Sequence, residues 1–93
     1  MTQILTAVKT ALRITTTAFD DELNELILAA LLDLKLAGIS NQDTDDPLVR
    51  RAVITYCRLH FGEPDDFDRL KKSYDEQKAQ MSMATGYTTW TEA

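Results

Sequence analysis

The chain has 93 residues, which is the size of one small domain and too short for a second hydrophobic core. Hydrophobic residues make up 44% and charged residues 27%, a balance that excludes wholesale disorder, collagen-like repeats and coiled-coil composition. Fifteen acidic against ten basic residues give a net charge of -5, so the protein lacks on average the phosphate attraction that drives non-specific DNA binding.

The first predicted helix spans residues 3–13. Three glycines and two prolines leave few turns, and the long segments between them indicate helices rather than short strands. From Ile4 to Leu12 apolar residues recur at steps of three and four, which places them on one side of a helix. The β-branched run Ile14–Thr17 has poor helix propensity and predicts a connector.

The second predicted helix, residues 20–37, has two apolar faces. Thr17 or Asp20 is the expected cap, and Gly38 is the expected stop. The principal stripe consists of Leu23, Leu26, Ile27, Ala30, Leu31 and Leu34, whereas Leu28, Leu32 and Leu36 lie off it. Two apolar faces require two partners. Either the other helices of the chain enclose this helix, or its second face contacts another subunit.

The third predicted helix spans residues 47–61. Asp46 accepts hydrogen bonds from free N–H groups at a helix start, Pro47 fits the first turn, and Gly62 is the expected stop. The fourth, residues 66–82, begins after Pro64 and carries the sparser apolar stripe Phe67, Leu70, Tyr74 and Met81. The predicted fold is all-α, a small four-helix bundle-like domain over residues 1–83.

Residues 84–93, with the sequence ATGYTTWTEA, lack a helical period and are predicted to form a flexible C-terminal tail. Tyr87 and Trp90 bury little area in such a segment, and these residue types are common anchors of protein interfaces. Either the tail docks on a partner, or it folds back over an apolar groove of its own domain.

No arrangement of residues in the sequence specifies catalysis, a metal site or a cofactor site. Cys57 and His60 stand three residues apart on one helix, but their neighbours are apolar and no third group or oxyanion loop accompanies them. The acidic loop with Asp43, Asp45 and Asp46 lacks the register of a calcium-binding EF-hand. Because the glycines are isolated, no phosphate-binding loop is expected. We predict that the protein is not an enzyme.

The predicted compartment is a reducing cytoplasm. Cys57 is the single cysteine and cannot form an intramolecular disulfide, and the N-terminus lacks the zones of a secretory signal. The most apolar run, Leu26 to Ile39, contains Asp33 and Lys35 and is shorter than the roughly 20 residues of a membrane-spanning helix. A soluble protein without membrane contact is expected.

Basic residues cluster on the third and fourth predicted helices, at Arg50, Arg51, Arg58, Lys71 and Lys72. This cluster permits the alternative function of a prophage-type helix-turn-helix regulator that reads DNA with the third helix. Acidic residues flank each cluster, so the competing interpretation is that these bases pair with acids within the chain or between subunits.

The order and spacing of several short strings resemble the small head-tail connector (adaptor) proteins of tailed bacteriophages and prophages, also called DNA packaging proteins. The similarity runs from about Leu5 to Tyr74. Its residues are Leu12-Arg13-Ile14, Phe19-Asp20-Asp21-Glu22-Leu23, Leu26-Ile27, Ala29-Ala30, Ala37-Gly38-Ile39, Asp46-Pro47-Leu48, Ala52-Val53, Tyr56, Phe61-Gly62 and Tyr74. The Thr15–Thr17 stretch and the C-terminal tail depart from the family pattern.

The resemblance implies a helical-bundle adaptor whose subunits form a homo-oligomeric ring below the portal protein. Genome DNA would pass through the ring during packaging and ejection without sequence-specific binding, and a downstream stopper or tail-completion protein would attach to it. The implied location is the head-tail junction of the virion, after assembly in the cytoplasm of the bacterial host.

The expected subunit interface joins an apolar face to charged surfaces in a head-to-tail contact. It comprises Leu28, Leu32 and Leu36, the acids Asp20, Asp21 and Glu22, and the bases Arg50, Arg51 and Arg58. Tyr87 and Trp90 are the expected contacts with the portal protein.

Overall fold

The computed structural model describes residues 2–62 and 65–83 of the chain. Its helices are α1 (Thr2–Leu12), α2 (Asp20–Leu36), α3 (Pro47–His60) and α4 (Phe67–Ser82). These bounds agree with the predicted ones to within one residue at each end, and no strand occurs in the described ranges. The predicted all-α fold class is confirmed.

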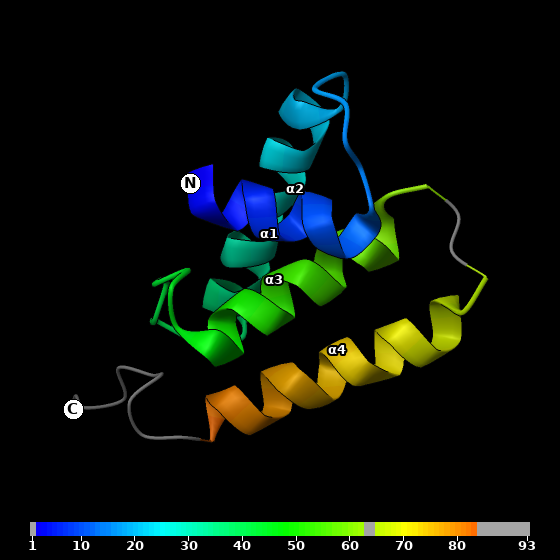
Figure 1. Ribbon diagram of the computed structural model, residues 1–93. Helices are drawn as coiled ribbons and strands as arrows, with labels where there is room; N and C mark the ends of the chain where they lie inside the picture. Colours follow the sequence, from blue (N-terminus) through cyan, green and yellow to red (C-terminus); the bar gives the residue numbers. More distant parts are fainter. Residues whose placement is uncertain (1, 63–64, 84–93) are drawn as a thin grey trace.

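Helix α3 is the centre of the fold. It packs against α1, α2 and α4, whereas α1 and α4 lie on opposite sides of it (Figure 1). Helices α3 and α4 run side by side over most of their length (Figure 1). One continuous core joins the four helices and consists of Ile4, Val8, Leu23, Ile27, Ala30, Leu34, Ile39, Val49, Ala52, Val53, Cys57, Tyr74 and Met81.

The start of α3 follows the local sequence. The Asp46 carboxylate accepts hydrogen bonds from the backbone N–H groups of Leu48 (2.9 Å) and Val49 (3.3 Å), and Pro47 occupies the first helical position. These two bonds satisfy donors that the helix itself leaves unpaired. The cap predicted at Asp46 is confirmed.

The start of α2 corrects the sequence expectation that Thr17 or Asp20 caps it. Phe19 occupies the cap position without a side-chain hydrogen bond, and its ring packs edge-on against Phe61 with the centroids 5.4 Å apart. Asp20 is instead the first helical residue, and its carboxylate pairs with Lys9 of α1 at 2.8 Å. Contacts with other helices, rather than a local cap, fix this end.

Two glycines end helices as predicted, and one helix ends without a glycine. Gly38 and Gly62 have φ angles of 92° and 73°, in the left-handed region that costs glycine little. After α1, Arg13 takes φ 60°, and the next N–H, of Ile14, donates to the Lys9 carbonyl. No glycine stands at this turn, so Arg13 itself takes the left-handed conformation.

Replacing Asp46 by alanine should lower the free energy of unfolding by about 1 kcal/mol, because the N–H groups of Leu48 and Val49 lose their acceptor. Urea unfolding followed by circular dichroism measures the change. Asp65→Ala, at an exposed position before α4, is the control and should leave stability unchanged. Equal losses in the two variants would contradict the capping role of Asp46.

Candidate functional site

Three leucines on α2 form an exposed apolar row, which we call the leucine face. Leu28, Leu32 and Leu36 follow one another at four-residue steps, and their exposed fractions are 58%, 56% and 78%. The principal stripe of the same helix is buried at Leu23, Ile27, Ala30 and Leu34. Enclosure of α2 by the other helices, one of the two sequence interpretations, is therefore wrong, because α3 and not α2 occupies the centre.

The predicted acidic residues at the start of α2 are divided between an internal and an external role. Asp20 pairs with Lys9 of the same chain, while Asp21 and Glu22 are exposed. Glu25, one turn further along, is also exposed. The outward side of α2 therefore carries acids in its first turns and leucines towards its end.

The three predicted interface arginines on α3 are likewise divided. Arg50 is held by the preceding loop, since its Nη2 lies 3.2 Å from the Asp45 carboxylate and its Nε donates to the Thr44 carbonyl at 3.1 Å. Arg51 and Arg58 are exposed. Of the three predicted interface arginines, Arg51 and Arg58 are therefore the ones that a neighbouring subunit can reach.

The geometry of α2 and α3 disfavours the helix-turn-helix alternative. Residues 37–46 separate the two helices, whereas a helix-turn-helix joins its helices by a turn of about 3–4 residues.

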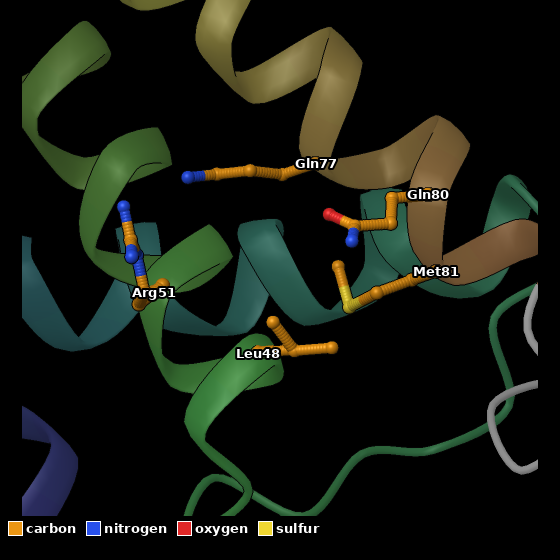
Figure 2. Close-up of a pocket in the computed structure, with 5 residues that line it drawn as sticks. All are labelled: Leu48, Arg51, Gln77, Gln80 and Met81. Carbon is orange, nitrogen blue, oxygen red and sulfur yellow. The ribbon is translucent and has the colours of Figure 1, made fainter.

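A hollow of about 140 Å³ lies between α3 and α4. Figure 2 shows Leu48 of α3 and Met81 of α4 pointing towards one another, with Arg51 and Gln77 beside them. Gln80 completes the lining, and Gln77 Oε1 is buried without a hydrogen-bond partner. The hollow was not predictable from the sequence, because it depends on how two helices pair. The apolar character of Leu48 and Met81 was its only signal.

Asp33 of α2 connects α2 to α4 through a small polar cluster. Tyr74 donates its hydroxyl to the Asp33 carboxylate at 2.5 Å, and Lys78 Nζ lies 3.1 Å from the same oxygen and 4.8 Å from the centre of the Tyr74 ring. Partial burial opposes the charged form of Asp33, but these hydrogen bonds and the Lys78 charge outweigh it and lower its pKa. Burial and the Asp33 hydrogen bond raise the pKa of Tyr74, so its proton stays in place as the donor.

Replacing Tyr74 by phenylalanine should lower the free energy of unfolding by about 1 kcal/mol at neutral pH, which is below the usual range for a hydrogen bond to a charged group because Asp33 is partly exposed. A lowered folded-state pKa contributes stability that is complete above the ordinary value of 3.8 and is lost as the pH falls through the folded value. The difference between wild type and Tyr74→Phe should therefore be constant above about pH 5 and shrink below it.

Urea unfolding at a series of pH values measures this difference. Tyr56→Phe is a suitable control, since the hydrogen bonds to Asp33 come from Tyr74 and Lys78. A difference that persists undiminished to strongly acid pH would show that the Tyr74 hydroxyl does not act through the Asp33 carboxylate.

Cys57 and His60 do not form a nucleophile and base. The Cys57 thiol is fully buried in the core, and burial raises its pKa to about 12, so it stays protonated. His60 is exposed, and its ring packs at a tilt against the Tyr56 ring with the centroids 4.3 Å apart. The arrangement fits a core thiol beside a surface imidazole.

The acidic loop before α3 holds its own backbone together. Asp43 accepts from the N–H of Asp45, Asn41 accepts from the N–H of Asp43, and Asp46 caps α3. Within residues 2–62 and 65–83, no group of three or more His, Cys, Asp or Glu residues is placed to hold a metal ion.

The predicted tail contacts Tyr87 and Trp90 lie outside the described residues. In the part of the chain that is described, none of the helices combines the length and apolar character needed to span a bilayer.

A comparison with protein-family models matches residues 4–88 to the phage connector protein family. The chain belongs to this family. The match covers α1 from its third residue, all of α2, α3 and α4, and the first part of the tail, so it includes Tyr87 but not Trp90. Searches of curated proteins and of solved structures gave no significant match. A phage connector-type role follows from the family, and the resemblance first seen in short strings is confirmed.

Proposed function

We propose that this phage connector protein is an adaptor subunit that assembles into a ring below the portal at the head-tail junction of the virion. The observation that carries the proposal is the leucine face of α2, which is exposed in the single chain. The ring provides a conduit for genome DNA during packaging and ejection, and a platform for a stopper or tail-completion protein. Assembly takes place in the host cytoplasm.

The contact between subunits joins two different surfaces of the chain. The leucine face and the first-turn acids of α2 lie on one subunit, and the exposed arginines of α3 lie on the next. Such head-to-tail contacts close into a ring when the rotation between neighbours permits it. Burial of the leucines supplies the attraction, whereas charges such as Asp21, Glu22, Arg51 and Arg58 set register.

The charge of the chain suits a conduit. With a net charge of -5, the ring has little overall attraction for the phosphate backbone, so DNA passes without being held. A strongly basic lumen would retard the genome during packaging and ejection. The proposed passage therefore requires neither base recognition nor a nucleotide site.

Replacing Leu32 by aspartate should weaken self-association by about tenfold or more, because a charge would be desolvated in the middle of the leucine face. Light scattering over a concentration series, with and without portal, measures the effect. Met83→Asp is the matched control, since Met83 is 82% exposed and lies beyond α4. A wild-type chain that stays monomeric at high concentration, both alone and with portal, would overturn the ring.

The C-terminal tail is the proposed contact with the portal, through Tyr87 and Trp90. Residues after Ala84 should become protected from protease only when portal is added, and Trp90→Ala should abolish that protection because the largest anchor is lost. Mass spectrometry of the digests measures it. Thr91→Ala serves as the control in the same segment. If phage particles that carry Trp90→Ala still join their tails to the head normally, the basis for this contact would be removed.

A further inference from the structure

The hollow between α3 and α4 has the size and character of a receptor for one aliphatic side chain. Its volume of about 140 Å³ is close to the roughly 150 Å³ of an engineered apolar cavity that binds benzene. Leu48, which is 38% exposed, and Met81 supply its apolar surface. The end of Arg51 adds a cation beside that surface (Figure 2).

The hollow lies at one end of a row along α3. Leu48, Arg51 and Arg58 are separated by three and seven residues, so they lie on one side of the helix. The row therefore begins with an apolar position at the start of α3 and ends with an exposed cation near its last turn. At the helical rise, Leu48 and Arg58 are about 15 Å apart along the axis.

The outward side of α2 carries the complementary order. Glu25 is exposed in its first half, and Leu32 and Leu36 are exposed towards its end. Eleven residues separate Glu25 from Leu36, which corresponds to about 16 Å along the axis. An α2 helix laid antiparallel along α3 thus brings its last exposed leucine to the hollow and its acid to the arginine.

We propose that Leu36 of one copy of this chain enters the hollow of the next copy, while Glu25 faces Arg58 across the same contact. The inference rests on the proposed ring and specifies which surfaces meet. The occupant is a second copy because the two rows match in apolar and charged order and in spacing. The two rows are different surfaces, one on α2 and one on α3, and a head-to-tail contact joins two different surfaces. In the antiparallel arrangement the two helix dipoles also point in opposite directions, so their interaction is attractive.

A charge exchange tests the proposed register. Glu25→Arg and Arg58→Glu should each weaken self-association about tenfold, because each places like charges opposite one another. The chain that carries both changes should associate within about threefold of wild type. Both positions are exposed, so folding is not at risk. Sedimentation or light scattering over a concentration series gives the association constants.

Glu76→Arg and Lys72→Glu are matched controls on the outer side of α4, away from α3, and should leave association unchanged alone or combined. Single variants at Glu25 and Arg58 that behave as wild type would overturn the inference. Single variants that weaken association without rescue in the double variant would overturn it as well.

Disulfide trapping tests the hollow itself. A Leu36→Cys chain mixed with a Gln80→Cys chain should form a cross-linked pair on oxidation, and Cys57 should not interfere because it is buried and protonated. Absence of this pair in wild-type-like assemblies would overturn the proposal. A pair whose yield rises in a Trp90→Ala background would also do so, since the chain's own tail would then be the occupant.

Failure of the contact is distinguishable from failure of the ring. If the wild-type chain assembles and Leu32→Asp disrupts it while the charge exchange has no effect, only the register proposed here is wrong. If the wild-type chain stays monomeric with and without portal, both the proposed ring and the proposed contact are wrong.

Discussion

The central position of α3 is the constraint on which the rest of the structure depends. Helix α3 packs against each of α1, α2 and α4, while the side that carries Leu48, Arg51 and Arg58 stays exposed. Its inward residues Val49, Ala52, Val53 and Cys57 are fully buried as a result. The other three helices each keep an outward side, and what those sides carry determines how the chain meets its surroundings.

On α2, that outward side is apolar where most surface helices are polar. A domain of 93 residues has limited apolar area to bury, so three leucines left exposed are a considerable loss for the isolated chain. They are an ordinary feature of a subunit that buries them in an assembly. The exposed face therefore supports the proposal that this phage connector protein works as one subunit of an assembly.

The polar contacts of the fold complement this division. Asp33, Tyr74 and Lys78 join α2 to α4, and Lys9 and Asp20 join α1 to α2. Each uses charges that would otherwise contribute to the outer surface. Arg51, Arg58 and Glu25 remain exposed, and at an interface such charges influence register and partner choice more than strength.

The helices and most of their ends were predictable from the sequence, because apolar period, the Asp46-Pro47 start and the Gly38 and Gly62 stops are local signals. The two-faced pattern of α2 also identified Leu28, Leu32 and Leu36 as candidates. Which helix lies at the centre, the Phe19 start of α2 and the hollow between Leu48 and Met81 depended on tertiary structure. Each of these features arises from the pairing of elements that are distant in the chain. The apolar period of a helix specifies that one of its faces is buried, but it does not specify which other helix covers that face.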